Sequence, residues 1–288
     1  MKKYPMTPKR IGALAALIAL AVVIVILAVV SLGGFLGNED AGQLLGMLLP
    51  AMILLPVFTW LCVWSFSSMR ERGKNNMKNM NAIDTVVLDI GNVLTYYVPR
   101  EYLAEHGLDE AMQERMLSAF MKNGAWNEYD RGVMTSEEVV ELIAANDPEI
   151  SEEIRRVLND SFSTLVLKAE YAIPFIRSLK SGGYKVYLLS NFSEKALVDC
   201  KDALDFMPEA DGAILSCKEQ VIKPDRAIYE RLFERYNLTP EKCVFLDDTP
   251  ANIEGAVAAG MKGIVFKDLA QAEAELEALG VVCEWNSK

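Results

Sequence analysis

Carboxylate side chains end two short apolar runs of this sequence. Asp89 closes the run TVVLD, and Asp247 and Asp248 close the run CVFLDD. An aspartate is ionised at neutral pH and can attack phosphorus as a covalent nucleophile, while several carboxylates together suit a hard cation such as Mg²⁺. Each aspartate alone is also an ordinary turn-capping residue. Together they indicate a site that combines a nucleophile with a metal ion.

Other polar residues occupy similar places in the sequence. Ser190 and Asn191 end the run KVYLLSN, Lys223 precedes a proline, and Asn252 follows the run CVFLDD in the next turn. Singly, these residues suit helix caps or a solvated charge. In a parallel sheet, however, the carboxyl ends of the strands meet in one crevice where ligands bind. We therefore expect these side chains to lie together.

The elements that must position these residues alternate between strand and helix. Short apolar runs separated by longer helical stretches predict a parallel sheet covered on both faces, a Rossmann-like α/β fold. The expected strands are 85–89, 185–190, 213–216, 243–248, 263–266 and 280–283. The segment between the first two strands is too long for a simple crossover and has helical patterns only. We expect it to form an inserted helical subdomain over residues 98–168.

Four segments in this order resemble the motifs of the haloacid dehalogenase-like hydrolase superfamily: DIGNVLT, LLSN, IKPDRAIY and FLDDTPANIEGAVAAGM. The resemblance covers residues from about 83 to 270 and includes the inserted helical cap. The Asp-x-Gly-Asn-Val form is similar to the branch that contains the bacterial α-glucose-1-phosphate phosphatase. The resemblance implies a Mg²⁺-dependent phosphomonoester hydrolase that forms an aspartyl-phosphate. Its substrate would be a small phosphorylated metabolite such as a sugar phosphate.

The resemblance also implies which residues hold the metal. Asp89 would be both nucleophile and ligand, and Asp248 and the Gly91 carbonyl would complete the direct protein ligands. Asp247 would hold a metal-bound water. A divalent cation among these groups relieves the repulsion between an anionic nucleophile and an anionic substrate.

The remaining motif residues are implied to act on the phosphoryl group. Ser190 and the Asn191 amide would hydrogen-bond its oxygens, and Lys223 would neutralise the charge that spreads over them. Asn252 would orient Asp247 or Lys223 from behind the site.

Gly91 departs from the usual pattern of the superfamily, in which the residue two after the nucleophile is an aspartate that protonates the leaving group. A Tyr96 hydroxyl, a cap residue or a metal-ordered water could replace it. The cap segment AWNEYDRG, 125–132, either faces the pocket or simply packs Trp126 and Tyr129 in the cap core. Two other functions stay open: a metal-independent dehalogenase-like hydrolase, and a catalytically weak membrane-anchored binding or sensor protein.

Other catalytic classes find little support in the composition. His106 is the single histidine and falls in a helical-looking segment, so Ser-His or Cys-His catalysis is disfavoured and we expect His106 at the surface. The five cysteines form no Cys-x-x-Cys pair, which argues against a zinc site.

Two long uncharged tracts precede the hydrolase motifs. No charged residue occurs in 11–38 or in 41–69, and each tract exceeds the roughly 20 residues that cross a bilayer as a helix. We expect transmembrane helices at about 11–37 and 44–68, followed by a basic linker that ends near residue 80. Residues 1–80 would then form a membrane hairpin, and residues 81–288 the hydrolase domain.

The charges predict the orientation of this hairpin. Basic residues flank both tracts on their outer sides, whereas the connecting turn carries Glu39 and Asp40. By the positive-inside rule, the protein would pass twice through the cell (inner) membrane with its catalytic domain in the cytoplasm. Residues 81–288 hold 21 basic and 37 acidic side chains. So acidic a domain disfavours nucleic-acid binding, and the expected partners are the lipid bilayer and a small phosphorylated substrate.

Overall fold

A computed structural model describes residues 82–283 and six isolated positions before them, which are residues 24, 28, 31, 61, 64 and 65. The chain divides into two units, Met1–Met80 and Asn81–Lys288. Almost all of the two predicted membrane spans, 11–37 and 44–68, lies outside the described residues. Within the part that is described, no helix is long and apolar enough to cross a membrane.

The second unit is built on a five-stranded sheet in the order β5-β4-β1-β6-β7, whose pairings are all parallel. The strands are β1 (Thr85–Leu88), β4 (Lys185–Ser190), β5 (Gly212–Leu215), β6 (Cys243–Asp247) and β7 (Lys262–Val265). This confirms the predicted α/β fold with a parallel sheet. The chain leaves the central strand β1 toward β4 and β5 and later returns to β6 on its other side. Such a reversal opens a crevice at the carboxyl ends of the strands.

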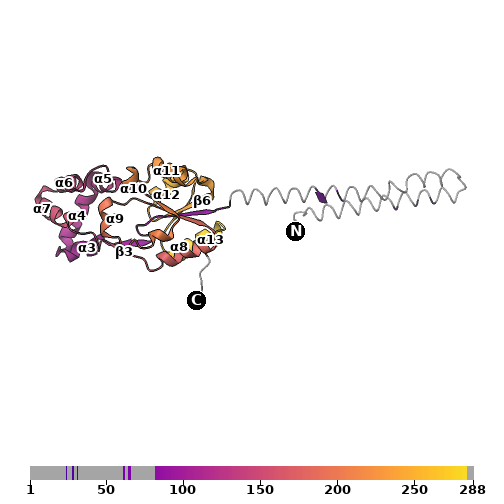
Figure 1. Cartoon of the computed structure of the whole chain (residues 1–288), viewed down its shortest axis with the longest axis horizontal. Coiled ribbons are helices and arrows are strands. Elements are labelled where there is room, and N and C mark those ends of the chain that lie inside the picture. Colours follow the sequence, from indigo (N-terminus) through magenta and orange to yellow (C-terminus); the bar gives the residue numbers. More distant parts are fainter. Residues whose placement is uncertain are drawn as a thin grey trace, which may run out of the picture. The chain divides into compact units, whose positions relative to one another are not determined.

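Helices cover both faces of this sheet because successive strand residues point to opposite sides. Val86 and Leu88 of β1 belong to the hydrophobic core that contains Phe175 of α8 and Leu276 of α13. Val87 between them belongs to a second core with residues of α11 and α12. Figure 1 shows these two helix pairs on opposite sides of the strands. The covering helices are α8 (Ala172–Ser181), α11 (Arg226–Tyr236), α12 (Pro250–Ala258) and α13 (Leu269–Ala278).

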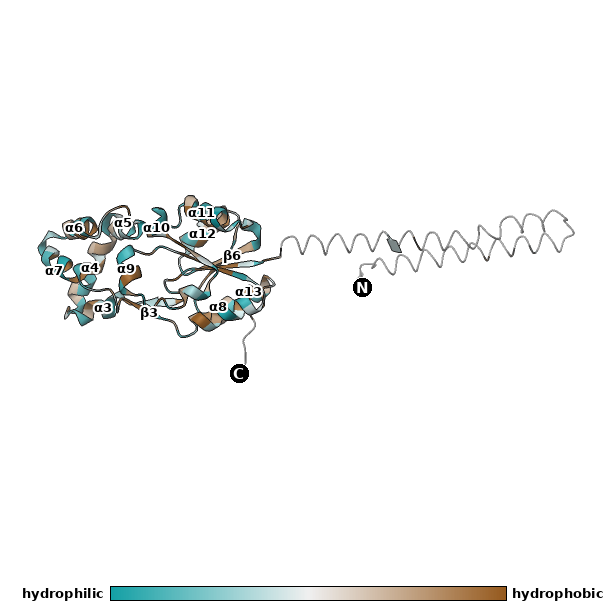
Figure 2. Cartoon of the chain, viewed as in Figure 1, coloured by the Kyte–Doolittle hydropathy of each residue, from teal (hydrophilic) through white to brown (hydrophobic). Residues whose placement is uncertain are grey.

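The helices are amphipathic, so each turns a hydrophobic stripe inward. Figure 2 shows hydrophilic and hydrophobic residues mixed along α8 and α11. In α8 the buried hydrophobic positions include Phe175, Ile176 and Leu179, at the spacing of one helix face. Gly182 follows this helix as its C-cap.

A helical insertion lies between β2 and β3. It comprises α3 (Pro99–Glu105), α4 (Glu110–Met121), α5 (Ala125–Arg131), α6 (Ser136–Asn146) and α7 (Ser151–Asn159). The helix α6 begins with a capping box, in which the side chains of Thr135 and Glu138 satisfy each other's backbone N–H groups. In Figure 1 these helices gather away from α8 and α13. Two short helices, α9 (Glu194–Asp199) and α10 (Ser216–Glu219), follow β4 and β5.

Two expectations about strands were wrong. The segment 98–168 is not entirely helical, because β3 (Val166–Lys168) pairs antiparallel with β2 (Thr95–Tyr97). These two strands form a ribbon at the base of the insertion. The run 280–283 is not a strand: Gly280 turns the chain with φ of +87°, and the Val281 N–H bonds back to Leu276 of α13.

Candidate active site

Asp89 lies at the point where the central strand β1 ends. Its backbone N–H donates to the Leu246 carbonyl of β6 at 2.9 Å, which fixes it against the neighbouring strand. One of its carboxylate oxygens accepts a 2.7 Å hydrogen bond from the Ile90 N–H. Asp89 is only 6% exposed. The sheet therefore presents a nearly buried carboxylate in a fixed orientation at its carboxyl edge.

Lys223 lies between two of the predicted carboxylates. Its Nζ is 2.8 Å from Asp89 Oδ1 and 2.6 Å from Asp247 Oδ2, and it also donates to the Leu189 carbonyl at 3.1 Å. The Asn191 side chain holds the Lys223 backbone, accepting from its N–H at 2.8 Å and donating to its carbonyl at 3.1 Å. Asn191 thus positions Lys223 in this structure, a contact that the sequence did not predict.

Asp247 is completely buried and its two oxygens are bonded within the protein. Oδ1 accepts from the Thr249 N–H at 2.8 Å and from the Asn252 amide at 3.0 Å. Oδ2 accepts from Lys223 and from the same amide at 3.1 Å. Of the two residues that Asn252 was expected to orient, Asp247 and Lys223, its amide contacts Asp247.

Asp248 is the more accessible neighbour of Asp247. Its Oδ2 accepts from the Asn92 amide at 2.9 Å, and its Oδ1 accepts from the Thr249 hydroxyl at 3.2 Å. Carboxylate oxygens of Asp89, Asp247 and Asp248 all lie within 4.8 Å of one another. Three hard oxygen donors at this spacing, with one cation among them, suit a Mg²⁺ ion that also keeps water ligands.

The electrostatics of Asp89 follow from its burial. Desolvation raises the pKa of Asp89 to about 6, Lys223 opposes this shift, and Asp247 adds to it. A hydrogen bond from the Ser190 hydroxyl also favours the ionised form and lowers the pKa of Asp89. Burial alone would lower the pKa of Lys223, but the two carboxylates beside it raise that pKa above its ordinary value. Lys223 therefore stays charged and keeps Asp89 from becoming a neutral acid at neutral pH.

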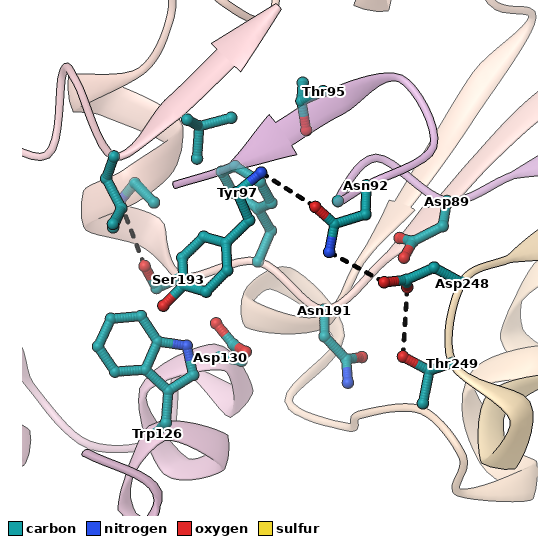
Figure 3. A pocket seen from close by; sticks show the side chains of 15 residues that line it. Asp89, Asn92, Thr95, Tyr97, Trp126, Asp130, Asn191, Ser193, Asp248 and Thr249 are labelled. Atoms are coloured by element: carbon teal, nitrogen blue, oxygen red, sulfur yellow. Dashed lines mark hydrogen bonds between the residues drawn. The ribbon is translucent and has the colours of Figure 1, made fainter. Parts of the chain in front are cut away.

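A cavity of about 210 Å³ opens in front of these residues. Figure 3 shows Asp89, Asn92 and Asp248 on one side of it and Tyr97, Trp126 and Asp130 on the other. Of the predicted site residues, the ones that line the cavity are Asp89, Gly91, Asn191 and Asp248. The others form a buried layer beneath it: Ser190, Lys223, Asp247 and Asn252.

Sequence reasoning missed several residues that line this cavity. Asn92 has a φ of +53°, a conformation that asparagine tolerates better than most residues. In the sequence it appeared only as part of the motif DIGNVLT. The segment 125–132 drew attention to Trp126, which lines the cavity, but not to Asp130, which lines it too. Tyr129 packs in the core of the insertion with 4% exposure.

The structure bears on two expectations, that the Tyr96 hydroxyl could replace the missing acid and that His106 lies at the surface. Tyr96 is 48% exposed and is not one of the residues that line the cavity. Tyr97 beside it does line the cavity. The His106 side chain is 11% exposed rather than at the surface, and its ring contacts the Tyr102 carbonyl at 2.8 Å and Asp160 at 3.2 Å. His106 is likewise not among the residues that line the cavity.

Known proteins resemble this chain in sequence. A 22% identical relative, a sesquiterpene phosphatase of Aspergillus oryzae, matches over 193 residues, which is 67% of this chain and 94% of the relative. A phosphorylated carbohydrates phosphatase of Thermotoga maritima is 27% identical over 148 residues, 51% of this chain and 67% of that protein.

Solved structures share the fold. A haloacid dehalogenase family enzyme of Bacteroides thetaiotaomicron, crystallised with magnesium and inorganic phosphate, superposes with a TM-score of 0.51 at 20% identity, covering 65% of this chain and 95% of that one. A dehalogenase with an intermediate bound reaches the same TM-score of 0.51 at 17% identity, covering 63% and 84%. The sequence profile of the haloacid dehalogenase-like hydrolases matches residues 83–260, and this chain belongs to that family.

Proposed function

We propose that this protein is a Mg²⁺-dependent phosphomonoester hydrolase that works through an aspartyl-phosphate on Asp89. One observation carries this proposal: the carboxylates of Asp89, Asp247 and Asp248 lie within 4.8 Å of one another beside the cavity. Such a cluster repels an anionic substrate unless a cation neutralises it. Phosphatases among the relatives support the same reaction class. The proposed substrate is a small phosphorylated metabolite such as a sugar phosphate, in line with the resemblance of the motif Asp-x-Gly-Asn-Val to the α-glucose-1-phosphate phosphatase branch.

The proposed roles follow from the position of each group. Asp89 attacks phosphorus, because it is the carboxylate of the cluster that ends the central strand and reaches the cavity. Lys223 neutralises charge on the phosphoryl group from beside Asp89. The Ser190 hydroxyl, which bonds to Asp89 in this structure, turns to donate to a phosphoryl oxygen when substrate binds. Asn191 contributes its backbone N–H, since its side chain is bonded to Lys223.

The metal is held by Asp89, Asp248 and the Gly91 carbonyl in this proposal. Asp247 stays bonded to Lys223 and Asn252 and orients a water from beneath. When bound, Mg²⁺ would supply charge neutralisation between nucleophile and substrate. Asn92 holds Asp248 at 2.9 Å and fixes its orientation toward the cluster.

The metal-independent dehalogenase is a weaker candidate. A neutral carbon centre gains nothing from three clustered carboxylates, whereas a phosphate held with a cation does. A binding or sensor protein without turnover is weaker still, because such a function does not require a nearly buried carboxylate and lysine pair at a strand end.

Two further features belong to the same proposal. The insertion α3–α7 serves as the cap that closes over the substrate, since its residues Trp126 and Asp130 line the cavity. The uncharged tracts 11–37 and 44–68 anchor the protein in the inner membrane with the hydrolase unit in the cytoplasm, as their length and flanking charges suggest.

Hydrolysis of p-nitrophenyl phosphate by the purified full-length chain tests the proposal. We expect turnover with Mg²⁺, none with a chelator, and covalent labelling of Asp89 by radiolabelled phosphate. Asp89→Asn should abolish turnover. Asp84→Asn is the matched control, because Asp84 lies five residues earlier, before the opposite end of β1, and its side chain is 58% exposed. Activity toward a 2-haloacid without metal would favour the dehalogenase, and binding without turnover would favour the sensor.

A further inference from the structure

Gly91 leaves the proposed reaction without a proton donor on the loop that carries the nucleophile. Poor leaving groups must be protonated as they depart, and general acid catalysis is worth about 10²–10⁴-fold in rate. The cavity contains three aspartates, and two of them, Asp89 and Asp248, belong to the carboxylate cluster. The third is Asp130, at the end of α5 in the insertion. It reaches the cavity from the side opposite the nucleophile (Figure 3).

The backbone around Asp130 is attached to the hydrolase unit. The Ser216 hydroxyl of α10 donates to the Asp130 carbonyl at 2.6 Å and accepts from the Phe192 N–H at 2.9 Å. Gly132 follows α5 with a φ of +68°, and a Cβ there would lie 2.7 Å from the Cys217 carbonyl oxygen. The end of α5 therefore packs closely against α10, which holds Asp130 in place over the site.

The Asp130 carboxyl group has no partner to occupy it. Throughout residues 82–283 no hydrogen bond or ion pair to this carboxylate is present, whereas Asp147 on the same insertion is bonded to Arg115 at 2.5 Å. The Tyr97 hydroxyl, which also belongs to a residue that lines the cavity, is buried without a hydrogen-bond partner. Buried polar groups are normally hydrogen-bonded. The buried Tyr97 hydroxyl and the half-buried Asp130 carboxyl, both without a partner at one cavity, therefore point to a polar ligand there.

The environment of Asp130 suits proton transfer near neutral pH. Burial raises the pKa of Asp130 to about 7; the charge of Lys223 lowers it and that of Asp89 raises it. The titratable groups that interact with it are Lys223, Asp89, Tyr97, Tyr129 and Cys217. An acid–base catalyst is most effective when its pKa lies near the working pH.

We propose that Asp130 is the catalytic acid and base that replaces the aspartate missing at Gly91, an inference that rests on the proposed phosphatase function. In the first step the Asp89 carboxylate forms a bond to phosphorus, the bond from phosphorus to the leaving oxygen breaks, and that oxygen takes the proton of Asp130. In the second step the oxygen of a water forms a bond to phosphorus and gives a proton to the Asp130 carboxylate, while the bond from phosphorus to the Asp89 oxygen breaks. Phosphate leaves, and Asp89 and protonated Asp130 are restored.

The test compares Asp130→Asn with wild type in the full-length protein. With an alkyl phosphate, kcat/KM should fall by about 10²–10⁴-fold, because the leaving alkoxide needs a proton. With p-nitrophenyl phosphate, kcat/KM should fall by less than about tenfold, since nitrophenolate leaves unprotonated. The slow second step should then produce a burst of one nitrophenolate for each active site. Such a burst also proves that the variant is folded.

Glu128→Gln is the matched control, because Glu128 lies on the same helix but pairs with Arg131 and does not line the cavity. It should keep wild-type kcat/KM on both substrates. Equal losses on both substrates in Asp130→Asn, or no loss on the alkyl phosphate, would overturn the role of Asp130 while leaving the phosphatase function intact. A wild type that hydrolyses neither ester would overturn both.

Discussion

Lys223 Nζ lies 2.8 Å from Asp89 and 2.6 Å from Asp247, so that one buried ammonium group is shared by two carboxylates from neighbouring strands. The lysine side chain is 1% exposed and Asp247 is fully buried. Burying charges is costly unless they are paired and hydrogen-bonded. The ion pair between Lys223 and Asp89 compensates this cost and also orients the nucleophile. Within the described part of the chain, the only other side chain that bonds to Asp89 is Ser190.

Removal of the lysine charge should therefore affect stability and activity together. Lys223→Met leaves two buried carboxylates unpaired, and we expect the free energy of unfolding to fall by about 3–5 kcal/mol. Lys218→Met is the control, since Lys218 is half exposed and pairs with Glu194 at the surface. It should change stability by less than about 0.5 kcal/mol. Thermal unfolding of both variants checks this, and equal effects would contradict a special role for Lys223.

Asp248 should matter for the metal and little for folding. Asp248→Ala removes an accessible ligand, so we expect the Mg²⁺ concentration for half-maximal activity to rise at least about tenfold or activity to be lost. The melting temperature without metal should stay close to that of wild type. Cys243→Ser should lower the melting temperature and leave the Mg²⁺ requirement unchanged, because Cys243 is completely buried in β6. If activity of Asp248→Ala responded to Mg²⁺ as wild type does, the metal assignment would be wrong.

The raised pKa of Asp130 predicts how stability depends on pH. A carboxyl group whose pKa is raised from 3.8 to about 7 in the folded state contributes stability below its unfolded pKa and loses that contribution as pH rises through the folded value. An amide side chain cannot ionise, so Asp130→Asn should stabilise the protein more at about pH 8 than at about pH 5, and the difference between the two pH values should be at most about 3 kcal/mol. Melting temperatures at both pH values measure this. A pH-independent effect of Asp130→Asn would contradict the raised pKa of Asp130.

Much of the site was predictable because strand ends in a parallel sheet are a repeated geometry. Once TVVLD, KVYLLS and CVFLDD are recognised as strands, the positions of Asp89, Ser190 and Asp247 at one edge follow. The resemblance of the segment IKPDRAIY to the third motif of the superfamily also predicts that Lys223 lies close to these three residues. By contrast, the use of Asn191 to hold the Lys223 backbone depends on loop conformation, which the sequence pattern does not specify.

The insertion was harder to predict in detail. Its helices show clear periodicity, but the ribbon of β2 and β3 is only three residues on each strand, too short for a reliable alternation signal. Asp130 was missed because an acidic residue at a helix end is usually solvated. The hydrogen bond from Ser216 to its carbonyl and the packing of Gly132 against Cys217 bring distant segments together and hold this end of α5 at the cavity.

The membrane hairpin is a prediction from charge and hydropathy. A reporter that is active only outside the inner membrane should be inactive when fused after Lys288 and active when inserted between Asn38 and Ala41, because positive flanks stay in the cytoplasm. Deletion of residues 11–68 should move the protein from the membrane fraction to the soluble fraction. An active reporter after Lys288 would refute the orientation, and an unchanged membrane fraction would refute the spans.

Gly91 offers a way to return the missing acid to its usual place. A Cβ at Gly91 meets no atom within 4 Å, and its φ is not positive, so an aspartate side chain can be accommodated there. We expect Gly91→Asp to make the enzyme less sensitive to the leaving group, since the added carboxyl can protonate poor ones. The effect should be larger in the Asp130→Asn background, where Gly91→Asp should recover at least about tenfold of the lost kcat/KM on alkyl phosphates.

The measurement is kcat/KM across a series of phosphate monoesters of graded leaving-group pKa, for wild type, each single variant and the double variant. Gly91→Ala is the matched control, because it fills the same space without a proton donor and should recover nothing. Non-additive recovery between positions 91 and 130 is the signature of two groups that serve one proton transfer. If Gly91→Asp lowers activity equally in both backgrounds, the two positions act independently and the wild-type proton donor lies elsewhere.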